Sequence, residues 1–111
     1  MFGIKHIQDT VFDAWQGESK DFFCDHLLEL DSMDKLELES ISDFFQNNQG
    51  RHFGLALGEG VLSQELSNKM WDICLQMLTR DILNKKRISF LVGNKKDYEL
   101  ICELFAKDDK R

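Results

Sequence analysis

The stretch that most constrains the fold of this chain runs from residue 62 to residue 85. Its apolar residues recur at the three- and four-residue spacing of one helix face, so it predicts a long helix, with a break near Ser67 left open. These apolar residues are Leu66, Met70, Ile73, Cys74, Met77, Leu78 and Ile82. A stripe of Met and Trp on such a helix is more typical of a core than of a cofactor contact.

The N-terminal half predicts two further helices. Residues 4–15 carry apolar side chains at helical spacing and are followed by a stop at residues 16–19. Residues 20–31 are apolar enough to be buried, and periodicity leaves a short helix and a packed loop equally open. An acidic, amphipathic helix is expected from about residue 33 to 46, ending in the turn-rich residues 47–50.

The C-terminal half predicts extended segments around the long helix. Residues 53–57 are followed by Gly58-Glu59-Gly60, which indicates an extended segment and a turn. A nucleotide-binding loop is a weak alternative there, because a third glycine and a Gly-Lys-Ser/Thr ending are missing. Residues 88–92 form a β-branched apolar run typical of a strand, and residues 98–105 predict a last helix.

Charge and composition narrow the possible partners. The chain has 111 residues, no proline and a net charge of −6, which predicts one domain over residues 1–111. Residues 1–50 contain three lysines against eleven acids, whereas residues 51–111 contain eleven basic residues against nine acids. An acidic half repels nucleic-acid phosphates and favours a basic protein partner, although a merely solubilising coat accounts for it equally well.

The apolar runs, the first residues and the cysteines together predict the cellular compartment. No apolar run approaches the ~20 residues of a membrane span, so no membrane contact is expected. The first residues lack a secretory signal, and three cysteines without paired spacing suit a reducing compartment, so the protein is expected to be cytoplasmic.

Catalytic and metal-binding patterns are sparse. The three histidines are scattered, and their spacing suggests no cluster of serine, histidine and acid. Cys24-x-His26 offers two soft ligands without a second pair, so we expect no metal site. The sequence therefore predicts a carrier or a binding protein rather than an enzyme.

One motif precedes the acidic helix. Asp31-Ser32-Met33-Asp34 places a serine between acids, where it is a plausible helix N-cap. The motif, with the Leu36-Glu37-Leu38 that follows it, resembles the attachment site of acyl and peptidyl carrier proteins. The resemblance also covers the 28 residues from Ile4 to Ser32 and the Phe-Gly stretch that begins at Phe53, and it extends over residues 4–79.

The resemblance implies a fold and a function. It implies a mainly α protein with a small carrier-protein-like helical bundle at residues 4–79. Residues 80–111, whose own pattern predicts a strand and a helix, would be an extension without a counterpart in a minimal carrier. An α+β fold in which residues 53–57 pair with the extension as a small two-stranded sheet is the alternative. A 4'-phosphopantetheine arm on Ser32, with Asp31 beside it, would carry an acyl or aminoacyl group in fatty acid or polyketide biosynthesis.

The resemblance also implies partners. A phosphopantetheinyl transferase and acyl-handling enzymes would dock their basic patches on the acidic helix. The implied contacts are Met33, Glu37, Glu39 and Asp43. A second hypothesis from another class needs no serine chemistry: a small acidic inhibitor or immunity-type protein that covers a basic toxin or nuclease.

Overall fold

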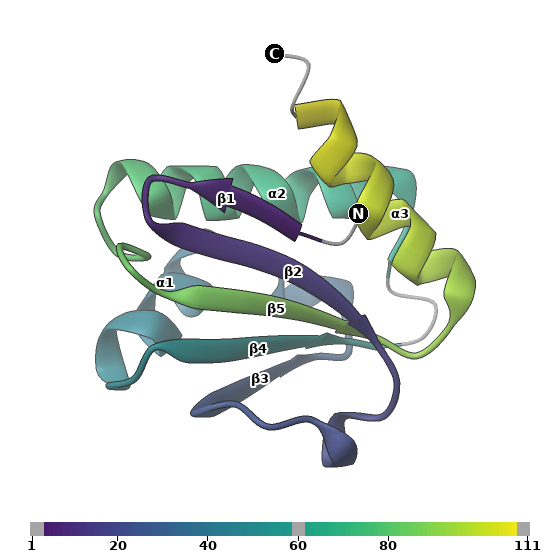
Figure 1. Ribbon diagram of the computed structural model, residues 1–111, viewed down its shortest axis with the longest axis horizontal. Helices are drawn as coiled ribbons and strands as arrows, with labels where there is room; N and C mark the ends of the chain where they lie inside the picture. Colours follow the sequence, from purple (N-terminus) through teal and green to yellow (C-terminus); the bar gives the residue numbers. More distant parts are fainter. Residues whose placement is uncertain (1–3, 59–61, 109–111) are drawn as a thin grey trace.

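The computed structural model describes residues 4–58 and 62–108, which form an α+β protein around one mixed sheet (Figure 1). The strands are β1 (Ile4–Ile7), β2 (Thr10–Gln16), β3 (His26–Leu30), β4 (His52–Leu57) and β5 (Arg87–Val92). The helices are α1 (Leu38–Asn47), α2 (Gln64–Thr79) and α3 (Lys95–Asp108), with short 3-10 turns η1 (Ser19–Asp21) and η2 (Met33–Lys35). Among the described residues, none of these helices has the length and apolarity needed to span a bilayer.

The strands lie in the order β1-β2-β5-β4-β3, as Figure 1 shows from top to bottom. β1 pairs with β2 antiparallel, whereas β2, β5, β4 and β3 run parallel to one another. β5 lies in the middle, and its residues from Ile88 to Val92 are all buried, as is usual for a central parallel strand. The C-terminal segment therefore supplies the centre of the sheet and pairs with β4 along five residues.

The helical connections and the connection from β2 to β3 lie on opposite faces of the sheet. From β3 to β4 to β5 the chain steps one strand at a time through α1 and α2, while from β2 to β3 it crosses the sheet in the opposite direction. Because parallel crossovers are right-handed, connections that run in opposite directions lie on opposite faces. We call the face that receives the helices the helix face and the other the open face.

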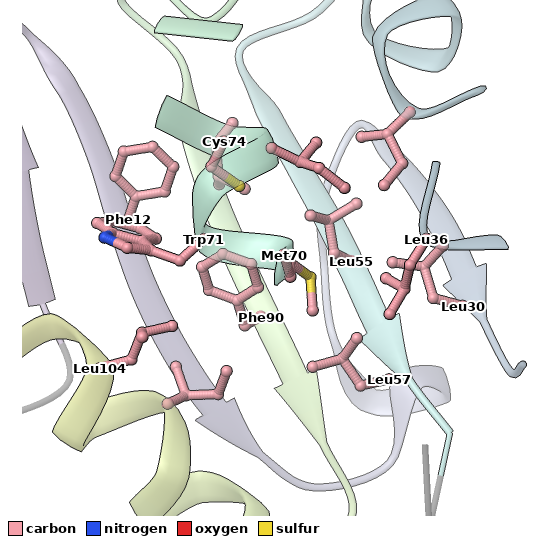
Figure 2. Close-up of a cluster of buried hydrophobic side chains, with 14 of the residues drawn as sticks. Phe12, Leu30, Leu36, Leu55, Leu57, Met70, Trp71, Cys74, Phe90 and Leu104 are labelled. Carbon is pink, nitrogen blue, oxygen red and sulfur yellow. The ribbon is translucent and has the colours of Figure 1, made fainter. Parts of the chain in front are cut away.

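The core fills the space between the helices and the sheet (Figure 2). An aromatic pair joins each helix to a strand: Phe12 to Trp71 at 4.9 Å between ring centroids, Phe90 to Phe105 at 5.9 Å and Phe45 to Phe53 at 4.7 Å. All three helices thus contribute aromatic rings to the same core, and these six side chains are at most 2 % exposed.

The predicted helical bundle is wrong, because a sheet of five strands organises the described chain. The two-stranded alternative is also too small. The predicted helix at residues 4–15 is instead a β-hairpin, in which Gln8 and Asp9 have φ values of 48° and 68°. Two consecutive positive φ values are typical of the tight turns that join paired strands.

The remaining predictions of elements had mixed outcomes. The extended segment at residues 53–57, the strand at 88–92 and the last helix are confirmed as β4, β5 and α3. The long helix is confirmed as α2 without a break near Ser67, but it ends at Thr79 and not near residue 85. The predicted turn after β4 falls partly on residues 59–61, outside the described residues. The acidic helix is shorter than predicted: α1 begins at Leu38, and residues 26–30 form a strand that periodicity did not identify.

Candidate functional site

The predicted site residues lie along the connection from β3 to α1. Asp31 and Ser32 follow the last residue of β3, and Met33 opens η2, with its side chain outside the described part of the structure. Glu37 occupies the N-cap position of α1, where its side chain makes no capping hydrogen bond, while Glu39 and Asp43 lie on the helix. Ser32 is therefore not the N-cap of the acidic helix, as the sequence had suggested.

The surroundings of Ser32 do not fit a phosphopantetheine arm. Ser32 lies between a strand and a three-residue 3-10 turn, and its carbonyl oxygen accepts a hydrogen bond from the Lys35 amide at 3.3 Å. The Asp31 carboxylate is engaged by the Lys35 ammonium at 2.8 Å, and this ion pair lowers the pKa of Asp31. No helix of two or more turns begins at Ser32, so backbone amides are not stacked there to hold a phosphodiester.

The connection from β2 to β3 crosses the open face, and we call residues 17–25 the strap. Phe22 faces the sheet, where its ring lies 5.2 Å from that of Trp15 on β2 and 5.2 Å from that of His52 on β4. Cys24 also faces the sheet, because a Cβ at Gly54 would lie 3.3 Å from its sulfur. Phe23, between these two inward residues, is 93 % exposed.

Asp25 fastens the end of the strap. Its Oδ2 accepts hydrogen bonds from the backbone amides of Arg51 at 2.8 Å and His52 at 3.0 Å, and these bonds lower the pKa of the carboxyl. The Asp25 amide in turn donates to the His52 carbonyl at 2.8 Å. Both termini of the strap are thus tied to the sheet, since the Gly17 amide donates to the Val92 carbonyl at 3.0 Å.

Two polar pairs lie on the open face near the strap. The Arg87 guanidinium contacts the Asp13 carboxylate at 2.6 Å, and the His52 ring lies 2.8 Å from the Ser89 hydroxyl. A serine–histidine pair is the arrangement of many nucleophilic sites, but Ser89 has no exposed surface and Phe22 packs on His52. Burial, followed by the charge of Arg87, lowers the pKa of His52. The pair therefore fastens β4 to β5 rather than exposing a nucleophile.

The carboxyl ends of the parallel strands surround a depression of about 210 Å³. Glycines at the ends of β2, β4 and β5 line it, together with the exposed carboxylates of Glu29 and Asp31. This edge is where parallel sheets usually bind ligands. The described residues nevertheless include no group of three or more His, Cys, Asp or Glu side chains that could hold a metal ion.

Exposed acidic side chains lie along the region of the chain from β3 to α1. We call the six exposed acids of this region the acidic patch: Glu29, Asp31, Asp34, Glu37, Glu39 and Asp43. Lys35 pairs with Asp31, and Arg80 approaches Glu39 at 3.9 Å. The other four acids make no ion pair among the described residues. The patch thus keeps most of its negative charge.

Sequence reasoning identified the acids of this region but not the exposed aromatic residue of the strap. Phe22 and Phe23 look alike in the sequence, and only the contacts of the strap with β2 and β4 show that one is inward and the other exposed. No family model, no curated protein and no solved structure matches the chain, so its function is argued from this geometry alone.

Proposed function

We propose that this protein is a small, non-catalytic binding protein that recognises a basic surface of another protein, with Phe23 on the open face as the anchor and the charge of the acidic patch as the attraction. The observation that carries the proposal is the 93 % exposure of Phe23 on a strap that is tied to the sheet at both ends. Aromatic residues that are fully exposed yet held on an ordered segment are suited to anchor an interface.

The charges give this surface its preference. Four acids of the patch make no ion pair among the described residues, so their field attracts cationic proteins and repels phosphate backbones. Such a field mainly raises the association rate, while a desolvated aromatic anchor slows dissociation. An inhibitor that covers a basic toxin or nuclease would use both contributions.

The same proposal includes the cytoplasm as the compartment. Cys24, Cys74 and Cys102 are all free thiols, and two of them are buried in the fold. Free cysteines of this kind suit a reducing environment. Carriage of an acyl group on Ser32 stays a prediction from the resemblance, and no contact around Ser32 favours it.

Photo-cross-linking in the native host tests the proposed function. A photoreactive phenylalanine analogue at position 23 is expected to capture a basic protein, whereas the same analogue at the exposed Gln76 of α2 is expected to capture none. The captured protein, once purified, should bind the wild type in a salt-sensitive manner. Phe23→Ala should weaken that binding by about 2 kcal/mol or more, the usual cost of losing an anchor residue.

Two results would contradict the proposed function. One is an identical set of adducts from positions 23 and 76, which would make the Phe23 region an ordinary surface. The other is a purified adduct partner whose affinity does not change with salt or with Phe23→Ala.

A further inference from the structure

We propose that the outer edge of β3 pairs with an extended basic segment of the partner, which joins the sheet as an additional strand. The inference rests on the proposed function and adds the form in which the basic partner is held. It follows from three features of this edge: its open backbone, the alternation of its side chains and its charge.

The backbone of β3 is open on one side. Among residues 4–58 and 62–108, β3 is the last strand in the sheet order and pairs with β4 alone, over the five residues from His26 to Leu30. Edge strands present unpaired amides and carbonyls, and proteins usually protect them with proline, lysine or a covering segment. β3 contains neither proline nor lysine, and Glu29 is its one acidic or basic charge besides His26.

The side chains on the open-face side of this edge alternate. Leu27 pairs with Gly54 and touches the position of its missing Cβ, so it lies on the face of the strap; Glu29, two residues later, lies on the same face. Asp31 follows in the same alternation and lines the same depression as Glu29; Lys35 contacts its Oδ1 at 2.8 Å, so a basic residue of the partner would share this exposed carboxylate with Lys35. Leu27 is 36 % exposed and provides an apolar position before the two acids.

This order specifies the sequence that the edge would accept. Side chains on neighbouring strands meet in directly opposed pairs, so an incoming strand would place an apolar residue against Leu27 and basic residues against Glu29 and Asp31. In the parallel orientation that β3 already has with β4, the partner segment has the pattern apolar-x-basic-x-basic from its N-terminal to its C-terminal end.

Charge also decides against the two alternatives at the sheet edges. Two copies of β3 paired with each other would bring like carboxylates together, in a chain with a net charge of −6. The opposite edge, β1, spans only Ile4–Ile7 and carries Lys5, which is unsuited to a basic segment. The edge of β3 is therefore the one that combines an open backbone with negative charge.

A synthetic peptide provides the test. The probe is Thr-Val-Thr-Lys-Thr-Lys-Thr, in which one valine and two lysines have the predicted spacing. We expect saturable binding in NMR titrations at low salt, with slower hydrogen exchange at amides of residues 26–30. A reordered peptide of the same composition, with adjacent lysines, should bind roughly two- to tenfold more weakly, because its side chains no longer oppose those of β3.

Backbone methylation separates strand pairing from charge attraction. Only alternate amides of a strand face one neighbour, so of two peptides N-methylated at alternate positions, one should lose binding about fivefold or more and the other should keep it. Glu29→Lys should weaken binding roughly two- to tenfold, whereas the matched Glu65→Lys on α2, also an exposed acid, should not.

Several outcomes would overturn the edge pairing. One such outcome is that both methylated peptides bind equally well and hydrogen exchange at residues 26–30 does not slow. The peptides would then be attracted by the acidic side chains without pairing with β3. If none of the peptides binds, the strand pairing is also refuted. The proposed function is tested separately, by cross-linking at position 23. Another outcome is slower hydrogen exchange at residues 26–30 at high protein concentration without peptide, together with a doubled mass in sedimentation. The edge of β3 would then pair with a second copy of this chain instead of a basic segment.

Discussion

Replacing Gly17 by alanine is expected to destabilise the protein by about 2–4 kcal/mol, because no side chain fits between the strap and Trp15. A Cβ at Gly17 would lie 2.5 Å from an indole carbon of Trp15, and the backbone φ of Gly17 is +159°. Such a backbone conformation costs a residue other than glycine about 1–3 kcal/mol. Moving the indole also disrupts its contact with Phe22 at 5.2 Å, and an aromatic pair contributes about 0.5–1.5 kcal/mol.

Urea unfolding followed by circular dichroism measures this cost, and a double-mutant cycle assigns it. In a Trp15→Ala background the clash and the ring contact are already absent, so Gly17→Ala should cost only the backbone share, about 1–3 kcal/mol. Gly93 is the matched control, since a Cβ there meets nothing within 4 Å; Gly93→Ala should stay within about 0.5 kcal/mol of the wild type. An equal cost of Gly17→Ala in both backgrounds would refute the argument, because the indole would then play no part.

Three further predictions concern the core, pH and Ser32. Phe90→Ala should cost about 3–5 kcal/mol in urea unfolding, while Phe23→Ala should change stability by less than about 0.5 kcal/mol; comparable losses would show that Phe23 packs in the fold. Because the pKa of folded His52 lies below its ordinary value of 6.5, the unfolded chain takes up the proton first as the pH falls. Stability should therefore fall from pH 6.5 down to the folded pKa, and His52→Gln should flatten this decline; an unchanged slope would contradict the assignment. Incubation with coenzyme A and a broad-specificity phosphopantetheinyl transferase should leave the intact mass unchanged, and a gain that disappears in Ser32→Ala would restore the carrier hypothesis.

The sequence predicted elements where one periodicity was dominant. α2 and α3 carry helical spacing over several turns, and β5 is a short segment in which four of six residues are apolar, two of them β-branched and one aromatic. The hairpin at residues 4–16 was wrongly predicted as a helix, because Ile4, Ile7 and Val11 have helical spacing although they lie on paired strands. Gln8-Asp9 is not a strong turn signal, so nothing local distinguished the two structures.

The candidate site was predictable only in part, and for a physical reason. The acids of the patch are visible as composition, whereas the orientation of Phe23 depends on contacts of Phe22 with Trp15 and His52, seven and thirty residues away. Ser32 shows the opposite error. Its flanking acids suggested a helix start, but the buried Leu30 before it belongs to a strand, and the pairing of that strand with β4 decided the local structure.

The central position of β5 also determines when this protein can fold during synthesis. β2 and β4 are not neighbours in the sheet, and the strand that pairs with both of them is β5, at residues 87–92 near the end of the chain. Until the ribosome has released those residues, the earlier strands form two separate apolar pairs with unfilled inner edges, which are prone to aggregate. A nascent or truncated chain ending at residue 79 should therefore associate with chaperones or precipitate, and the whole sheet should form in one late step.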